Sequence, residues 1–365
     1  MNNSLKKTEN TWLVGDSDNE VVLASRVRLA RNFAGIPFPN RANAQQLEAV
    51  LMKAGDSFSD IENVLKKRLD VLDIEKLGSL ERQVLIEKQL IRRQMVVQPK
   101  SRAVFMDRDE TAAVMVNEED HLRIHCMGRG LCLEKQLERA FSIDDAVEVR
   151  QDIAFDEKLG YITSCPTNLG TGLRATAVLH LPGLFYTQNM QNITTVSQQL
   201  GLSVRPLFGK GNESKGNLYI IANQMTLGFS EQGIIDNIVS AVQGITDNEL
   251  RARKALQMFS GAMLENSARR ALGIMKYGSL LEWDEAMEFI SKIRLGIDLG
   301  YITEVSHEDM GRLIIAIQPA YIKYTGNNEN MSPTELCKAR ADLVQAVLAG
   351  RGTDYYMETG EKYES

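Results

Sequence analysis

Hydrophobic positions along the chain follow two different periods, and these divide the sequence into a mixed region and a helical region. The pattern over 21–32 predicts a strand. Helical spacing then predicts a helical region over 44–90, with apolar positions at Leu47, Val50, Leu51, Phe58, Ile61 and Leu65. Further on, the pattern predicts a helix over 131–141, preceded by short strands at 103–106, 112–116 and 121–126.

The middle of the chain contains two loops. A glycine-rich loop over 166–173 leads into a predicted strand at 174–181, and a loop over 205–216 precedes a strand at 218–222. Between them, apolar positions predict a helix, namely Met190, Ile193 and Val196.

Beyond about residue 247 the strand patterns stop and a period near 3.6 continues, so we expect a domain boundary within 247–255. The expected organisation is α+β, with four parts. These are a polar leader (1–20), a mixed domain (21–250), an all-helical C-terminal domain (251–350) and a polar tail (351–365).

Arginines gather on one side of three predicted strands. Because side chains alternate along a strand, Arg26 and Arg28 share a face, and Arg123 and Arg174 each lie on one face of their own strands. If the three strands pair in one sheet, these arginines converge. Converging guanidinium groups suit a polyphosphate, since arginine offers paired donors to phosphate oxygens and keeps its charge. The alternative is that each arginine lies on a solvated strand face.

Composition narrows the class of protein. The net charge of −6 argues against a general nucleic-acid binder, which needs a basic surface. The four cysteines include no C-x-x-C pair, which disfavours a zinc ribbon and a disulfide framework. No run approaches the roughly 18 apolar residues of a membrane span, and the first ten residues lack the apolar core of a secretory signal. We therefore expect a cytoplasmic protein without membrane or direct nucleic-acid partners.

Common nucleotide-binding and metal motifs are missing from the sequence. NLGTGLRA (168–175) matches the dinucleotide fingerprint weakly, because it opens no helix, and we expect a loop that brings backbone amides near phosphate. Neither a Walker-type G-K-[ST] motif nor the HRD and DFG kinase motifs occur. His121 and His125 have no third ligand in the pattern, so no protein metal site is expected.

Several long segments resemble the ATP:guanidino phosphotransferases, the phosphagen kinase family. They are ASRVRLARN (24–32), VNEEDHLRIHCM (116–127), GYITSCPTNLGTGLRATAVLHLP (160–182) and NQMTLGFSE (223–231). The segments RLGIDLGYITEVS (294–306) and IAIQPAYIKYTG (315–326) are similar to the helical domain of McsB-type protein arginine kinases. The resemblance implies a catalytic core with an antiparallel sheet flanked by helices, followed by an all-helical C-terminal domain.

The resemblance also implies an activity, in which the γ-phosphoryl group of ATP passes to arginine side chains of proteins and Mg²⁺ is held mainly by the nucleotide phosphates. Glu119 would orient the guanidinium group and accept its proton, and Cys165 would lie beside that group. The residues expected to bind the phosphates are Arg26, Arg28, Arg123, Arg174 and Arg205. The wider set expected at the nucleotide is Ser25, Val27, Leu29, Gln89, Ala175, Thr176, Ala177, Val178, Pro206, Leu207, Phe208, Gly209 and Lys210.

Partners follow from the same resemblance. They are protein substrates with exposed arginines, a zinc-binding activator protein, a Clp ATPase and a second copy of the chain. The expected role is in the stress response, where the kinase marks proteins for Clp-type proteolysis or regulates a repressor.

Three positions depart from the family pattern. Lys210 stands where protein arginine kinases usually have a glutamate that contacts the substrate guanidinium, and Glu213 is the expected catalytic substitute. Gln89 replaces a histidine that helps to hold the nucleotide. In the phosphoarginine-reading R-D-x-x-R-A motif only the second half is present, with Arg340 as its arginine.

Two alternatives therefore stay open beside the protein arginine kinase. One is a kinase of free arginine or another small guanidine. The other is a catalytically degenerate paralogue that binds ATP or regulates partners.

Overall fold

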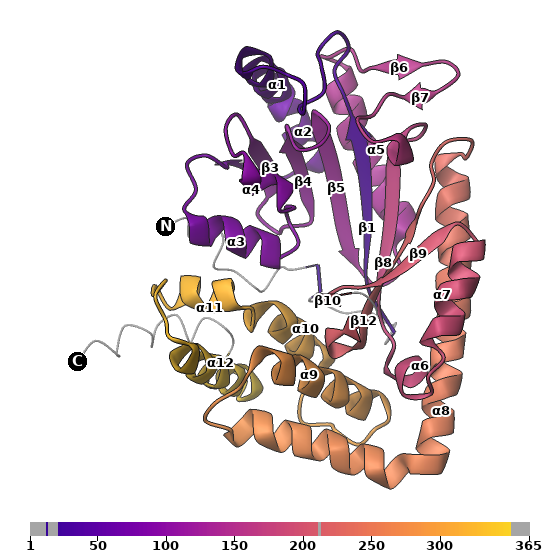
Figure 1. Cartoon of the computed structure of the whole chain (residues 1–365), viewed down its shortest axis with the longest axis vertical. Coiled ribbons are helices and arrows are strands. Elements are labelled where there is room, and N and C mark those ends of the chain that lie inside the picture. The colour runs from indigo at the N-terminus through magenta and orange to yellow at the C-terminus, as the bar shows by residue number, and fades with distance from the viewer. Residues whose placement is uncertain (1–11, 14–20, 211–212, 352–365) are drawn as a thin grey trace.

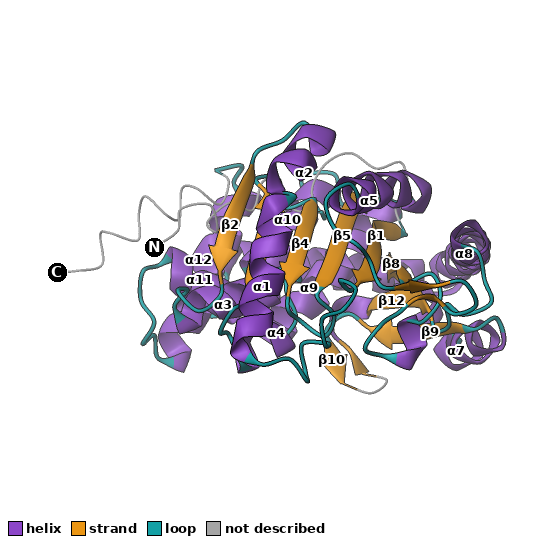
Figure 2. Cartoon of the chain, turned by 90° about the horizontal axis from the view of Figure 1, so that it is seen from above, coloured by secondary structure: helices purple, strands orange, loops and turns teal. Residues whose placement is uncertain are grey.

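An antiparallel sheet of eight strands forms the centre of the computed structural model, which describes residues 12–13, 21–210 and 213–351 (Figure 1). The strand order is β2-β3-β4-β5-β1-β8-β12-β9, and every neighbouring pair is antiparallel (Figure 2). The strands are β1 (Val22–Arg31), β2 (Leu69–Asp73), β3 (Ala103–Asp107), β4 (Ala112–Val116), β5 (Leu122–Arg129), β8 (Leu173–His180), β9 (Leu202–Pro206) and β12 (Leu218–Asn223). The predicted antiparallel sheet is confirmed.

Helices cover both faces of this sheet. One face packs against α1 (Ala44–Asp56), α2 (Phe58–Leu65), α5 (Leu133–Glu148), α7 (Met190–Gln199) and the first part of α8 (Glu231–Tyr277). The other face meets α3 (Ser79–Glu87), the end of α8 and the helices of the C-terminal region, which are α9 (Trp283–Asp298), α10 (His307–Ala316), α11 (Pro319–Thr325) and α12 (Pro333–Leu348). The C-terminal helices therefore share a core with the sheet.

Short elements connect these layers. They are α4 (Gln94–Val97), α6 (Pro182–Tyr186), the hairpins β6 (Phe155–Asp156) with β7 (Gly160–Tyr161) and β10 (Gly209–Lys210) with β11 (Glu213–Ser214), and the 3₁₀ turns η2 (Pro166–Asn168) and η3 (Lys215–Asn217). No helix in the described part of the chain combines the length and apolar composition that a membrane crossing requires.

The transition to the C-terminal region lies within a helix. Helix α8 continues through 247–255, where the sequence suggested a boundary, and its one residue with non-helical dihedral angles is Ser260 (φ −141°). No strand follows β12 in the described residues, in agreement with the expected helical character of the last third.

Three features differ from the sequence prediction. Strand β2 lies inside the expected helical region, because Leu69 and Leu72 have helical spacing but pair with β3 at the sheet edge. Strand β9 and the hairpin β10–β11 replace much of the loop expected at 205–216. Within the expected polar leader, Trp12 and Leu13 are buried in the core shared with the C-terminal helices.

A buried polar seam joins the end of β8 to helices α8 and α9. Arg253 lies between two carboxylates, with Nε 2.6 Å from Glu249 Oε1 and Nη1 2.6 Å from Asp298 Oδ2. Its Nη2 donates to the carbonyl oxygen of His180 (3.1 Å). Glu249 in turn accepts the backbone N–H groups of residues 183 and 184. We call Glu249, Arg253 and Asp298 the Arg253 seam.

Candidate functional site

The register of the central strands brings the predicted arginines together. Arg28 on β1 lies opposite His125 on β5 and Arg174 on β8, and Arg26 lies one pleat further along the same face. Arg123 is on that face of β5 as well, opposite Ala30. The prediction that three strands pair and that their arginines converge is therefore confirmed.

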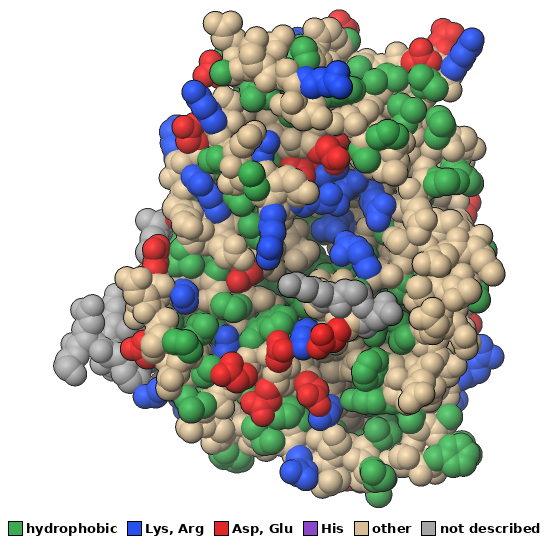
Figure 3. Space-filling view, viewed as in Figure 1, with side chains coloured by type: hydrophobic (Ala, Val, Ile, Leu, Met, Phe, Trp, Pro, Cys, Tyr) green, Lys and Arg blue, Asp and Glu red, His purple; other side chains and the backbone are tan. Residues whose placement is uncertain are grey.

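Two further arginines come from neighbouring segments. Arg205 on β9 and Arg92, just after α3, both repel the strand arginines and lower the pKa of Arg26. We call the full set the arginine cluster, and its members are Arg26, Arg28, Arg92, Arg123, Arg174 and Arg205. Figure 3 shows Lys and Arg side chains gathered beside a hollow in the middle of this face.

Arg92 was missed in the sequence because it follows an expected helix and belongs to no family segment. The available signal was its position, three residues after Gln89, which was itself expected at the nucleotide.

The arginine cluster is short of negative charge. Burial, followed by repulsion from Arg92, lowers the pKa of Arg26 to about 10, and burial with repulsion from Arg123 holds the pKa of Arg28 well below its usual value. Among the described residues, Arg26, Arg28 and Arg174 form no ion pair, and the buried Nε groups of Arg28 and Arg123 donate to no acceptor. Buried charges without partners are costly, so this arrangement suits an anionic ligand.

Two carboxylates lie at the edge of the arginine cluster. Glu118 forms an ion pair with Arg123 and is buried, while Glu119 accepts from Arg123 Nη2 at 2.6 Å and keeps 38% of its side chain exposed. Glu119 is therefore accessible to a second cationic group besides Arg123.

Hydrogen bonds tie this acidic turn to the segment that holds Cys165. Asp120 Oδ1 accepts from Asn32 Nδ2 (2.9 Å) and from the backbone N–H of Ser164 (2.7 Å). Cys165 is half-buried, with its Sγ 3.1 Å from Thr167 Oγ1, and it is an electrostatic neighbour of Arg174. Glu119 and Cys165 are therefore held at the same border of the arginine cluster.

Part of the predicted nucleotide set faces the other way. The side chains that alternate with the arginines lie in the core on the opposite face of the sheet, namely Ser25, Val27, Leu29, Ala175 and Ala177. The Ser25 hydroxyl is also used within the fold, since it donates to Gly130 O and accepts from Cys132 N. The sequence prediction took continuous runs of residues, whereas strand alternation allows only every second side chain to face the site.

The remaining predicted residues lie on or near the arginine face. Thr176 lies opposite Arg26. A small cavity is lined by four residues on or near this face, Gln89, Arg26, Val178 and Leu207. Its other lining residues are Ser25, Trp12, Met127 and Ile220. Pro206 ends β9, Leu207 and Phe208 pack towards the C-terminal core, and Gly209 begins the hairpin.

The β10–β11 hairpin contains Lys210, which departs from the family pattern, and Glu213, its expected substitute. Lys210 pairs through its backbone with Glu213, and its side chain lies outside the described structure. Glu213 is exposed and its Oε1 is 2.8 Å from Lys215 Nζ.

The glycines of the loop over 166–173 allow close packing of the backbone, and the loop's expected approach to phosphate stays a prediction. A Cβ on Gly172 would lie 2.7 Å from the carbonyl oxygen of Ala30, and one on Gly170 would lie 2.9 Å from Leu227 Cα. Both glycines also have positive φ, at 107° for Gly170 and 64° for Gly172. Protein backbone therefore fills the space that these glycines leave free.

The two strand histidines have different surroundings. His121 Nδ1 accepts from the backbone N–H of Phe33, and its Nε2 is 2.9 Å from Pro37 O, so its role is structural. His125 is buried under the arginine cluster, where burial and then Arg26 hold its pKa well below the usual value. Within the described ranges no group of three or more His, Cys, Asp or Glu side chains could hold a metal ion.

Arg340 is buried in α12, among the helices of the C-terminal region. Its Nε donates to Ile317 O (3.0 Å) and its Nη1 to Leu281 O (2.7 Å), so these donors hold α12 to the chain around it. A phosphoarginine-reading role gains no support from this arrangement.

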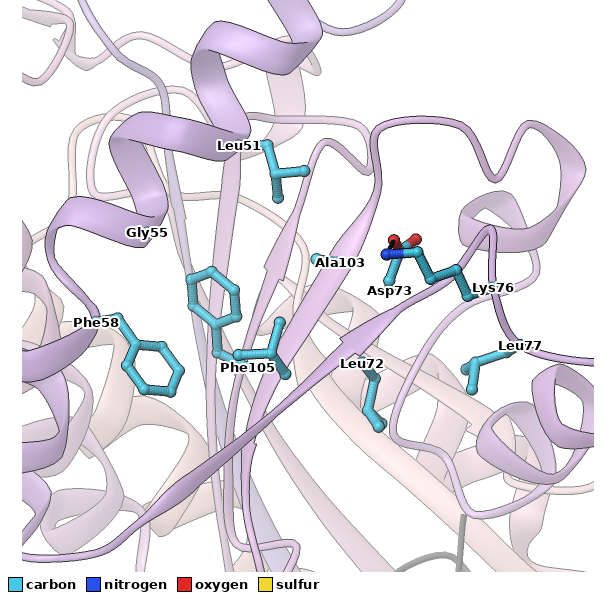
Figure 4. Close-up of a pocket in the computed structure, with 10 residues that line it drawn as sticks. Leu51, Gly55, Phe58, Leu72, Asp73, Lys76, Leu77, Ala103 and Phe105 are labelled. Atoms are coloured by element: carbon cyan, nitrogen blue, oxygen red, sulfur yellow. Dashed lines mark ion pairs between the residues drawn. The ribbon is translucent and has the colours of Figure 1, made fainter. Parts of the chain in front are cut away.

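A cavity of about 650 Å³ lies elsewhere, at the β2 edge beside α1 and α2 (Figure 4). Its lining is mainly apolar, and its ion pair is Lys76 with Asp73 at 3.0 Å. Because it holds no converging charges, it does not compete with the arginine cluster as a site for phosphates.

Two family models match the chain. Residues 52–252 match the ATP:guanido phosphotransferase C-terminal catalytic domain, and residues 261–358 match the protein-arginine kinase McsB C-terminal domain.

Curated relatives match over almost the whole length. The protein-arginine kinase of Desulforamulus reducens is 39% identical over 353 residues, which cover 94% of this chain and 98% of the relative. That of Pelotomaculum thermopropionicum is 38% identical over 352 residues, covering 95% and 99%. Among solved structures, a lombricine kinase has a TM-score of 0.57 at 23% identity, covering 67% of this chain and 70% of that one, and this likeness concerns the fold alone.

Proposed function

The chain belongs to the ATP:guanido phosphotransferase family, and we propose that it transfers the γ-phosphoryl group of ATP to arginine side chains of other proteins. One observation carries the proposal: a cluster of arginines without enough counter-charge lies beside an accessible glutamate. The cluster fits a polyphosphate, and the glutamate fits a guanidinium group.

The arginine cluster would bind the phosphates of ATP and stabilise the negative charge of the transferring group. Positioned cations of this kind account for much of the rate of phosphoryl transfer. Arg28 and Arg123 suit this role because buried N–H donors of both lack acceptors among the described residues.

Glu119 would act on the substrate. A protonated guanidinium is a poor nucleophile, so a carboxylate must orient it and accept a proton as the N–P bond forms and the bond to the ADP oxygen breaks. Cys165, tied to the same border through Asp120 and Ser164, would lie beside the guanidinium group.

Mg²⁺ would be held mainly by the nucleotide phosphates, where it would neutralise part of their charge. Glu118 fits this ion, because its Oε1 is buried and accepts no hydrogen bond from the described residues. A carboxylate oxygen of that kind is the donor that hydrated Mg²⁺ prefers.

The test is ³¹P NMR of the purified protein with Mg-ATP and an unfolded arginine-rich protein. We expect an acid-labile phosphoramidate signal on the protein substrate, and we expect Glu119→Gln to lower its rate by about 100- to 10,000-fold. Glu138→Gln, at an exposed glutamate of α5, is the matched control and should keep the wild-type rate.

A parallel tube with free arginine separates the two kinds of substrate. Signal only on free arginine would replace the proposal with a small-guanidine kinase. Signal in neither tube, with ATP still bound by calorimetry, would contradict phosphoryl transfer and favour a degenerate nucleotide-binding protein.

We also place the protein in the cytoplasm, and the four free cysteines support this because a reducing compartment keeps thiols unpaired. Marking of substrates for a Clp-type protease, regulation of a repressor, a zinc-binding activator and a homodimer stay predictions of the family resemblance.

A further inference from the structure

Both ends of the β10–β11 hairpin are fixed to helix α9 of the C-terminal region. Before the hairpin, Phe208 packs edge-on against Trp283, with ring centroids 6.0 Å apart. After it, a Cβ on Gly216 would lie 3.1 Å from Met287 O, and Asn217 Nδ2 donates to Ser291 Oγ at 2.9 Å. Helix α9 therefore determines where the hairpin begins and ends.

A lysine links the hairpin carboxylate to the same helix. Lys215 Nζ is 2.8 Å from Glu213 Oε1 and 2.7 Å from Asp284 Oδ2. The lysine side chain is 24% exposed, whereas Glu213 and Asp284 are 71% and 60% exposed. The hydrogen bond with Asp284, followed by that with Glu213, raises the pKa of Lys215. One cation is thus shared by two carboxylates from different parts of the chain.

We infer that Asp284 is a positioning residue for the reaction, which keeps Lys215 neutralised while Glu213 turns to the substrate guanidinium. The inference rests on the proposed function and on the expectation from the family pattern that Glu213 contacts the guanidinium group in place of the glutamate that Lys210 replaces. Without Asp284, Lys215 has Glu213 as its remaining ion-pair partner among the described residues, and the substrate must displace that lysine. With Asp284 present, the lysine keeps a carboxylate when Glu213 turns to the substrate, so Glu213 leaves the lysine at a smaller cost.

The test compares KM and kcat for an unfolded arginine-rich protein at saturating Mg-ATP. For Asp284→Asn we expect KM to rise about two- to fivefold, the range of one exposed ion pair, with kcat unchanged. Adding Lys215→Met to Asp284→Asn should return KM to the wild-type value, because the competing cation is gone. Glu288→Gln is the control on the same helix, since its carboxylate pairs with Lys292 and should leave both constants unchanged.

Two results would overturn the inference while the wild-type protein is active. One is a wild-type KM for Asp284→Asn. The other is a raised KM that Lys215→Met does not restore, which would mean that Asp284 acts through the helix and not through Lys215. An inactive wild-type protein would overturn the proposed function itself, and the inference with it, before any variant is compared.

Discussion

Two regions of this molecule bury arginine, and they treat its charge in opposite ways. In the Arg253 seam, one guanidinium group meets two carboxylates and a carbonyl oxygen at 2.6 to 3.1 Å. In the arginine cluster, six guanidinium groups act on one another, and the carboxylates that pair with them are Glu118 and Glu119.

This difference distinguishes an arginine expected to hold the fold together from arginines expected to bind a ligand. A buried charge whose donors are matched by acceptors is compensated, and its removal is costly because it leaves its partners uncompensated. Buried like charges repel one another, and an anionic ligand would offset this repulsion. The arginine cluster is therefore expected to trade stability for binding, whereas the Arg253 seam is expected to contribute stability alone.

The largest effect should follow from breaking the Arg253 seam. Arg253→Met leaves Glu249 buried without its cation and leaves Asp298 with His307 as its remaining partner, and we expect it to lower the free energy of unfolding by about 3–5 kcal/mol. Urea denaturation followed by circular dichroism measures this. Adding Glu249→Gln and Asp298→Asn should recover part of the loss, and a free energy of unfolding unchanged by Arg253→Met would contradict the structural role.

Arg28→Met makes the opposite change in the arginine cluster. We expect the rate of phosphoryl transfer to fall about 100- to 1000-fold, as when a preorganised donor to a transition state is removed. The free energy of unfolding should stay the same or rise, because burial and repulsion disfavour this charge in the folded protein. The two measurements are the rate of phosphoramidate formation and the midpoint of urea denaturation. A loss of stability as large as that of Arg253→Met would contradict the difference between the arginine cluster and the Arg253 seam.

The smallest effect concerns Arg92, at the exposed border of the arginine cluster. Arg92→Gln should weaken Mg-ADP binding about two- to tenfold, and the difference should shrink at high salt because exposed charges are screened. Calorimetric titration at low and high salt measures it, with Arg93→Gln at the adjacent exposed arginine as control. Equal losses for both variants would show that Arg92 acts only through net charge.

Several parts of this molecule were predictable from the sequence. Strand alternation and the family segments predicted the sheet, the helical last third and the arginines of β1, β5 and β8. Arg92 was not predictable in this way, because its approach to Arg26 depends on how the chain turns after α3. Strand β2 was not predictable either, because the spacing of Leu69 and Leu72 fits a helix equally well. Its pairing with the backbone of β3 decides in favour of a strand.

The sequence by itself determined that arginines and aliphatic residues alternate along the strands. The arginines therefore face one side of the sheet and the aliphatic residues face the other. Only the tertiary structure decided which charges are matched. Arg253 and Arg28 look alike in the sequence, but packing brings Arg253 two carboxylates and brings Arg28 other arginines. The physical reason is that a local pattern fixes the direction of a side chain, whereas charge compensation depends on neighbours that are distant along the chain.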